Sequence, residues 1–180
     1  MDKEISVKDK KFRVSITADE IQKNVKRVAD EINRDYKGGD IRFVGILNGA
    51  FMFAADLMKN ITVDCNIDFV KVSSYSGTSS TGEVTELIGL NKDIAGKDVI
   101  IVEDIVDTGI TMGEVLPTLQ AKGAKTVEIA VLLMKPGKLR VPLSVKYCAM
   151  EIPNEFIVGY GLDYDQQGRN LKDIYTVVDK

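Results

Sequence analysis

The sequence predicts an α/β protein with a central, mostly parallel sheet flanked by helices. Apolar runs of strand length alternate with segments of helical period along the 180 residues, and this alternation is typical of a parallel sheet. Two of the runs, at residues 41–47 and 99–102, lead through a glycine-containing turn into a helix. Because the carboxyl ends of parallel strands share one edge, we expect the functional site at that edge.

The composition excludes several classes of function. The chain has 24 Lys and Arg against 27 Asp and Glu, and this net charge of −3 argues against a large surface for nucleic acid or an anionic membrane. No apolar run approaches the ~18 residues of a membrane span, and no signal-type segment opens the chain. We expect one cytoplasmic domain, residues 1–180. Cys65 and Cys148 are expected to be reduced, with a single disulfide as the alternative.

Histidine is absent from the chain, which removes imidazole catalysis and histidine metal sites. Any proton transfer must therefore use carboxylates, lysines or tyrosines.

The first predicted helix follows a segment in which residues 14–16 could form an edge strand. Thr17 and Glu20 have the spacing of a capping box. Apolar residues at helical spacing come next, and the glycines at 38–39 end the helix. This helix is expected to dock on the sheet.

The second strand, residues 41–47, runs into the turn Asn48-Gly49-Ala50 and then into a helix at residues 51–58. Gly49 could make this junction suitable for a phosphate, or it could serve only a tight turn. The helix is apolar nearly all round, so we expect it to be buried or to form a subunit interface.

A Ser/Thr/Gly-rich loop at residues 75–82 separates a strand at 66–74 from a returning strand at 83–90. The loop could be a flap over a site or a plain exposed hairpin loop, and composition alone favours the exposed loop.

The helix after Thr111 contains Pro117, where we expect a kink or an early irregular turn, and it ends at Gly123. Three further strands are predicted, at residues 126–134, 144–150 and 174–178.

Residues 99–111 carry the strongest chemical signal. A strand of β-branched residues is followed by Glu103 and Asp104, and then by the turn 107–111 at the start of a helix. Orphan N–H groups and the helix dipole favour an anion there. Adjacent residues on a strand point to opposite faces, so the two carboxylates can share one sugar only if the strand ends at that point. Without the following turn they would be interpreted as a solvated strand end.

This stretch resembles the 5-phosphoribosyl diphosphate (PRPP) signature of the type I phosphoribosyltransferases. That signature is four hydrophobic, two acidic and two hydrophobic residues, then Asp-(Ser/Thr)-Gly-x-Thr. Further segments narrow the resemblance, over roughly residues 15–178, to the 6-oxopurine branch, the hypoxanthine-guanine phosphoribosyltransferases. They are the turn Leu47–Ala50, the loop start Ser73–Tyr75, the spacing of Lys135 and Phe156, the segment Phe156–Tyr164 and the later Arg169.

The resemblance implies a type I phosphoribosyltransferase fold with a mobile loop and a small hood built from the N-terminal residues and about 150–180. It also implies an enzyme that transfers 5-phosphoribosyl from PRPP to hypoxanthine or guanine, giving IMP or GMP plus pyrophosphate, through an oxocarbenium-like transition state. A homodimer or homotetramer is expected. One alternative is a PRPP- or nucleotide-sensing regulator of the same fold, and another is a non-catalytic subunit.

For the ribose half of the site, the resemblance places the 5-phosphate on the turn after the strand and the ribose hydroxyls on the two carboxylates. The turn residues are Asp107, Thr108, Gly109, Ile110 and Thr111, and the carboxylates are Glu103 and Asp104. Mg²⁺ could mediate the contact, since a diphosphate and carboxylates are hard oxygen ligands. Asp107 would handle the proton at purine N7, or its carboxylate would only cap the following helix.

For the base, Lys135 would donate to purine O6, Phe156 would stack on the ring, and Ile157 would contact it through the backbone. A donor at O6 explains a preference for 6-oxopurines, because the amino group of adenine would meet a donor with a donor. Asp163 would bind a second Mg²⁺ on the pyrophosphate side or lie near the purine 2-position.

Pyrophosphate would contact Asn48, Gly49 and the planar fork of Arg169. The mobile loop, opened by Ser74 and Tyr75, would close over it and exclude water. Members of this branch often carry lysine where this chain has Asn48. We therefore expect weaker binding of PRPP or pyrophosphate here, or more dependence on Arg169 and Mg²⁺. The peptide before Asn48 is expected to be cis.

Overall fold

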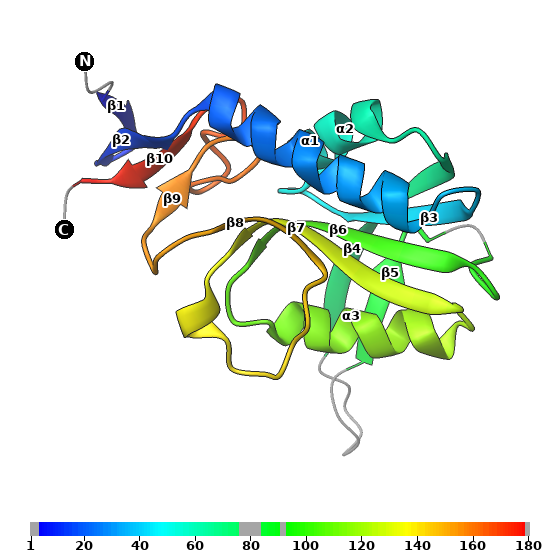
Figure 1. Ribbon diagram of the computed structural model, residues 1–180. Helices are drawn as coiled ribbons and strands as arrows, with labels where there is room; N and C mark the ends of the chain where they lie inside the picture. Colours follow the sequence, from blue (N-terminus) through cyan, green and yellow to red (C-terminus); the bar gives the residue numbers. More distant parts are fainter. Residues whose placement is uncertain (1–3, 76–83, 91–92, 179–180) are drawn as a thin grey trace.

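A computed structural model describes residues 4–75, 84–90 and 93–178 (Figure 1). Its larger sheet has six strands in the order β5-β4-β3-β6-β7-β8, and all neighbours are parallel except β5 and β4. The strands are β3 (Asp40–Ile46), β4 (Asp64–Tyr75), β5 (Val84–Ile88), β6 (Asp98–Val106), β7 (Thr126–Met134) and β8 (Tyr147–Glu151).

Helices cover both faces of this sheet, as Figure 1 shows. On one face α1 (Ala18–Asp35) and α2 (Phe51–Asn60) pack against Ile100 and Val102, and on the other α3 (Ile110–Ala121) packs against Val99 and Ile101. Successive residues of β6 thus enter opposite cores, which explains why its sequence is continuously apolar. The predicted α/β architecture is confirmed.

A four-stranded antiparallel sheet forms the hood from both ends of the chain, with the order β1-β2-β10-β9. Its strands are β1 (Glu4–Val7), β2 (Lys10–Ile16), β9 (Ile157–Val158) and β10 (Ile174–Val177). Phe12, Val158 and Tyr175 are buried between them. The prediction that residues 14–16 form an edge strand is wrong, because β2 lies between β1 and β10.

Most predicted boundaries are confirmed. The Thr17 hydroxyl accepts from the Glu20 N–H at 3.3 Å, and Gly123 follows α3 with a φ of +84°. Helix α3 continues through Pro117 to Ala121 without the early irregular turn expected there. Proline removes one helical hydrogen bond, but Val115 and Leu119 on either side of it are fully buried, and their packing holds the helix.

Helix α2 buries Phe53, Ala54 and Leu57, whereas Phe51 at its start is 41% exposed.

The loop expected over the site starts at the end of β4, and residues 76–83 and the side chains of Ser74 and Tyr75 lie outside the described part of the chain. Among the helices of the described residues, none is both long and apolar enough to cross a membrane.

Candidate active site

Glu103 and Asp104 lie where β6 loses one of its two neighbours. Pairing with β3 ends at Val102, whereas pairing with β7 continues through Glu103 to Val106. The expectation that β6 ends at these carboxylates is therefore wrong, since β3 ends instead; the Glu103 and Asp104 side chains nevertheless interact with each other, so a strand end is not needed to bring them together. The freed backbone is capped locally, because the Asp104 N–H donates to Glu103 Oε1 at 3.1 Å and the Ile105 N–H to Asp104 Oδ1 at 2.8 Å.

The two carboxylates form a closely coupled pair. Glu103 is buried, and burial together with the neighbouring Asp104 raises its pKa well above the ordinary value. Burial also raises the pKa of Asp104. A cation or hydroxyl donors at this position would relieve the repulsion between them.

The turn after β6 encloses a cavity of about 230 Å³, lined by residues 103–109 together with Thr111 and Met112. Gly109, with a φ of +79°, is the N-cap residue of α3 and has no side chain to cap the helix, while the Thr108 hydroxyl accepts weakly from the Ile110 N–H at 3.4 Å. A Cβ at Gly109 would lie 3.0 Å from Val141 Cγ2. The N-terminus of α3 thus opens into the cavity and offers backbone N–H groups, together with the Thr108 hydroxyl, to an anion.

Asp107 faces lysines from the loop after β7. Its Oδ2 accepts from Lys138 Nζ at 2.9 Å and lies 3.5 Å from Lys135 Nζ, whereas its buried Oδ1 has no hydrogen-bond partner. Burial alone would raise the pKa of Asp107, but the two lysines outweigh it and hold that pKa below its ordinary value. The alternative that Asp107 only caps α3 is wrong.

Of the base-binding candidates, Lys135 lies beside Asp107, and its ammonium reaches the residue before Phe156. Lys135 is buried, and its Nζ donates to the carbonyl of Glu155 at 2.8 Å. The next residue, Phe156, is 44% exposed, and its ring centre lies 5.5 Å from that of Tyr164 in an edge-on arrangement. Ile157 is buried in β9. A buried ammonium and a half-open aromatic face are thus held together by one hydrogen bond.

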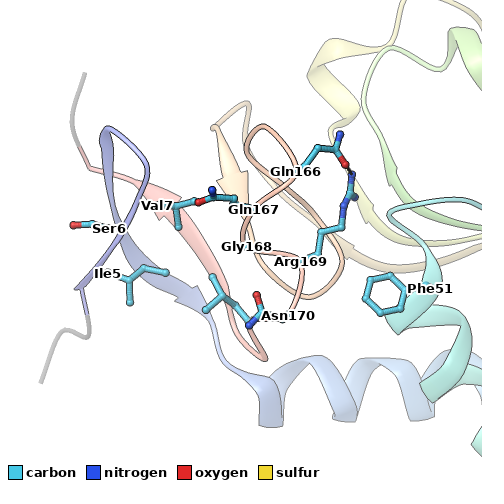
Figure 2. A pocket seen from close by; sticks show the side chains of 10 residues that line it. Ile5, Ser6, Val7, Phe51, Gln166, Gln167, Gly168, Arg169 and Asn170 are labelled. Atoms are coloured by element: carbon cyan, nitrogen blue, oxygen red, sulfur yellow. Dashed lines mark hydrogen bonds between the residues drawn. The ribbon is translucent and has the colours of Figure 1, made fainter.

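Arg169 belongs to a hood loop that borders a cavity of about 720 Å³ beside Phe51 (Figure 2). Its guanidinium donates to the carbonyl of Gly161 at 2.8 Å and pairs with Asp163 Oδ1 at 2.7 Å. The second oxygen of Asp163 accepts from the Gln166 N–H at 2.7 Å. Both Asp163 oxygens are therefore engaged within the hood.

Backbone contacts bring the turn after β3 against both halves of the site. The Leu47–Asn48 peptide is cis, as expected. A Cβ at Gly49 would lie 1.5 Å from Asp104 Oδ2, and a Cβ at Gly161 would lie 2.1 Å from the Gly49 carbonyl. Gly49 thus does more than make a tight turn, because only a residue without a side chain allows Asp104 to approach.

Comparison with known proteins agrees with this geometry. The family model of the phosphoribosyl transferase domain matches residues 16–165. Hypoxanthine-guanine phosphoribosyltransferases of Staphylococcus aureus (strain Mu50) and Staphylococcus epidermidis are 43% and 45% identical over 165 residues, 91% of this chain and 92% of theirs. The chain belongs to the hypoxanthine-guanine phosphoribosyltransferase family.

Solved structures of this family have the same fold. A hypoxanthine-guanine phosphoribosyltransferase from Bacillus anthracis superposes with a TM-score of 0.83 at 37% identity, covering 92% of this chain and 96% of the other. A hypoxanthine phosphoribosyltransferase from Staphylococcus aureus gives 0.84 at 43% identity, covering 91% and 90%. The resemblance inferred from residues 99–111 is confirmed, and the relatives are enzymes rather than regulators.

Lys138 is the site residue that the sequence analysis missed. It ends a short 3-10 turn, Pro136–Lys138, in which the Lys138 N–H donates to the Lys135 carbonyl at 3.0 Å. The turn brings both lysines to one carboxylate. A second lysine three residues after Lys135, with a proline between them, is the signal that could have identified it.

The fit of the site to Mg²⁺ depends on Glu103 and Asp104. Within the described residues, no three Asp, Glu, Cys or His side chains gather so that they could hold a metal ion. Magnesium is usually held by one or two carboxylates and completed by substrate phosphates and water. Buried Glu103 and partly buried Asp104 suit such a partial site, whereas Asp163 would first have to release Arg169.

Proposed function

We propose that this protein transfers the 5-phosphoribosyl group of PRPP to hypoxanthine or guanine, giving IMP or GMP and pyrophosphate. The observation that carries the proposal is Asp107, whose buried Oδ1 has no partner and which lies between an anion-binding turn and a buried lysine. An unpartnered buried carboxylate oxygen is costly unless a ligand completes it. A purine N–H is a donor of the required kind.

In the ribose half, the 5-phosphate binds the turn 107–111 at the N-terminus of α3, in the cavity lined there by residues 107–109 and Thr111. Glu103 and Asp104 hold the ribose hydroxyls at the open edge of β6. When bound, Mg²⁺ at these carboxylates neutralises charge on the diphosphate leaving group.

In the base half, Lys135 donates to purine O6. An ammonium has three donors, so this lysine keeps the Glu155 carbonyl and still has a donor for the base. The amino group of adenine would leave two donors unpaired. The cost is roughly 1–3 kcal/mol, which corresponds to about 5- to 150-fold in kcat/KM. Phe156 stacks on the ring and Ile157 contacts the base through its backbone.

The reaction passes through an oxocarbenium-like state with little bonding to either partner, so the protein must position the groups and exclude water. Asp107 is ionised at neutral pH, because Lys138 and Lys135 lower its pKa. As purine N9 bonds to C1′ of the ribose and the C1′–oxygen bond to pyrophosphate breaks, Asp107 accepts the proton from N7, so that the purine ring of the product is uncharged. Lys138 holds the carboxylate before substrate arrives.

On the pyrophosphate side, Arg169 exchanges its contact with Asp163 for the leaving group, while Asn48 and Gly49 offer neutral donors. Asp163 is then free to bind a second Mg²⁺ or to lie near the purine 2-position. Ser74 and Tyr75 close over the site. The proposal also includes that the protein assembles as a homodimer or homotetramer and acts in the cytoplasm.

The test is pyrophosphate release from PRPP and Mg²⁺ with hypoxanthine, guanine, xanthine or adenine. The proposal expects turnover with hypoxanthine or guanine and at least 5-fold lower kcat/KM with adenine, the lower bound of the donor mismatch. Turnover with none of the bases, together with RNA or DNA binding, would identify a regulator instead.

A further inference from the structure

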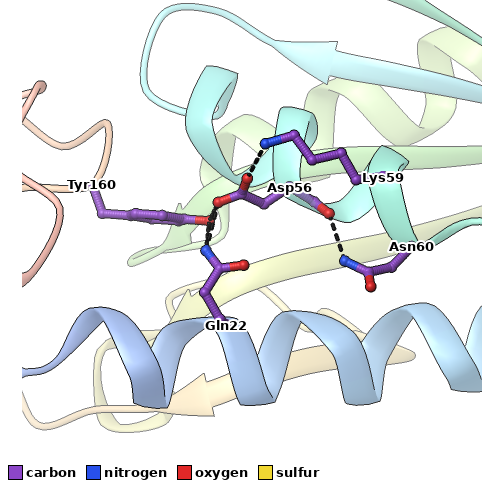
Figure 3. A network of polar contacts seen from close by, with 5 residues as sticks. All are labelled: Gln22, Asp56, Lys59, Asn60 and Tyr160. Carbon is purple, nitrogen blue, oxygen red and sulfur yellow. Dashed lines mark hydrogen bonds and ion pairs between the residues drawn. The ribbon is translucent and has the colours of Figure 1, made fainter.

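Tyr160 joins the hood to the helices of the main domain through a polar network at the edge of the core (Figure 3). It is 2% exposed, and its hydroxyl donates to Asp56 Oδ2 on α2 at 2.7 Å. The same oxygen accepts from Gln22 Nε2 of α1 at 2.6 Å, and Lys59 Nζ contacts Asp56 Oδ1 at 2.8 Å. Asp56 is thus a charged anchor shared by three elements.

The backbone on either side of Tyr160 leads directly to the pyrophosphate residues. The Tyr160 N–H donates to the Leu171 carbonyl at 2.8 Å, and the Gly161 N–H donates to the Arg169 carbonyl at 2.9 Å. The Arg169 guanidinium returns a hydrogen bond to the Gly161 carbonyl. A shift of Tyr160 would therefore move Arg169, and with it the paired Asp163.

The same loop also rests on the turn before α2. Gly161, with a φ of +98°, approaches the Gly49 carbonyl so closely that a Cβ would lie 2.1 Å from it. Helix α2 consequently meets the hood at two levels, at Gly49 before its start and at Asp56 in its second turn. These two contacts restrain both the position and the orientation of the hood loop relative to α2, more than either contact would alone.

We propose that Tyr160 is a positioning residue for pyrophosphate binding, which sets Arg169 and Asp163 over the Asn48–Gly49 turn by anchoring on Asp56 and Gln22. The inference rests on the proposed function, because the role of Arg169 in binding pyrophosphate is assigned there. Groups that bind a ligand need such support from residues that do not touch it. A misplacement of a reacting group by about 1 Å can lower the reaction rate roughly 100-fold.

The chain offers a matched control for this hydrogen bond. Tyr147 is 1% exposed, and its hydroxyl donates to Asp35 Oδ2 at 2.8 Å. That pair joins β8 to the end of α1, and the further polar partners that Asp35 has among the described residues are Lys146 and Arg34, which lie outside the proposed site. Tyr147→Phe therefore removes the same kind of hydrogen bond as Tyr160→Phe, without loosening the hood loop.

The experiment measures the dissociation constant of magnesium pyrophosphate by calorimetry, and the KM of PRPP and of hypoxanthine, for both variants. Tyr160→Phe should raise the dissociation constant of magnesium pyrophosphate and the KM of PRPP by roughly 5- to 10-fold. This is a fraction of the roughly 100-fold loss for a 1 Å misplacement. The KM of hypoxanthine should change less than twofold. Tyr147→Phe should change none of the three. Equal effects of the two variants would overturn the inference.

Two substitutions at the anchor complete the test. Asp56→Asn keeps an acceptor for Tyr160 and should retain most of the pyrophosphate affinity, whereas Asp56→Ala should reproduce the loss seen in Tyr160→Phe. If Tyr160→Phe does not fold, as judged by circular dichroism, the Asp56 pair decides the question, and equal affinities in that pair would overturn the inference. Failure of the wild type to turn over purines would instead contradict the proposed function.

Discussion

Gly49→Ala should disable the site through a single added methyl group. In the structure that Cβ would lie 1.5 Å from Asp104 Oδ2 and 2.5 Å from Asp104 Cγ. An ordinary contact between such atoms is about 3.4 Å, so the carboxylate oxygen must move by roughly 2 Å. The movement would disturb the 2.8 Å hydrogen bond from the Ile105 N–H to Asp104 Oδ1.

The expected magnitude follows from this displacement. A misplacement of a reacting group by about 1 Å can lower the rate roughly 100-fold, so kcat/KM of Gly49→Ala should fall by at least that factor. The measurement is steady-state pyrophosphate release with PRPP and hypoxanthine, combined with thermal unfolding to verify that the variant is folded.

Gly113→Ala is the matched control. It adds the same methyl group within α3, where the nearest atom, Val141 Cγ2, would be at an ordinary 3.6 Å. Alanine in a helix is favoured over glycine by about 1 kcal/mol, so this variant should keep its activity and unfold at a higher temperature. A folded Gly49→Ala enzyme with kcat/KM within threefold of wild type would refute the reasoning.

Three further predictions concern the same site. Lys138→Met should shift the acid limb of the pH profile of kcat/KM to higher pH, because Lys138 helps to lower the pKa of Asp107. Lys138→Arg keeps the positive charge and should leave the acid limb in place. An unshifted acid limb in Lys138→Met would contradict the pairing of Lys138 with Asp107. Asn48→Lys should lower the dissociation constants of PRPP and pyrophosphate by about 3- to 10-fold, as one added charge near an anion is worth roughly 1 kcal/mol; unchanged values would show that charge at this position is unimportant. Tyr75→Ala should lower the transfer rate far more than the affinity for the base, whereas equal losses would argue against a lid.

The fold could be predicted from the sequence wherever one segment contains the whole signal. The continuous apolar run at residues 99–102 identified the central strand, and Thr17 with Glu20 identified the start of α1. The error at residues 14–16 has a physical origin. β2 gains its second neighbour from β10 at the opposite end of the chain, and no local pattern at residues 14–16 reports this partner.

The candidate site shows the same difference between residues that lie in one segment and contacts that join distant segments. The turn proposed to bind the 5-phosphate and the two carboxylates before it are one continuous segment, so the signature they form was recognisable in the sequence. The contact of Gly49 with Asp104 and the hydrogen bond of Tyr160 to Asp56 join segments 55 and 104 residues apart. Neither leaves a periodic or compositional trace, so they emerge only when the chain is folded. Lys138 is intermediate, because its spacing from Lys135 is local but its partner is not.

Asp107→Asn tests the central claim most directly, because it keeps the size of the side chain and removes the ability to accept a proton. If Asp107 carries the purine proton, kcat for hypoxanthine should fall by roughly 100- to 10,000-fold, the usual contribution of a general base. The dissociation constant of PRPP should change less than about threefold. A kcat within threefold of wild type would contradict the account.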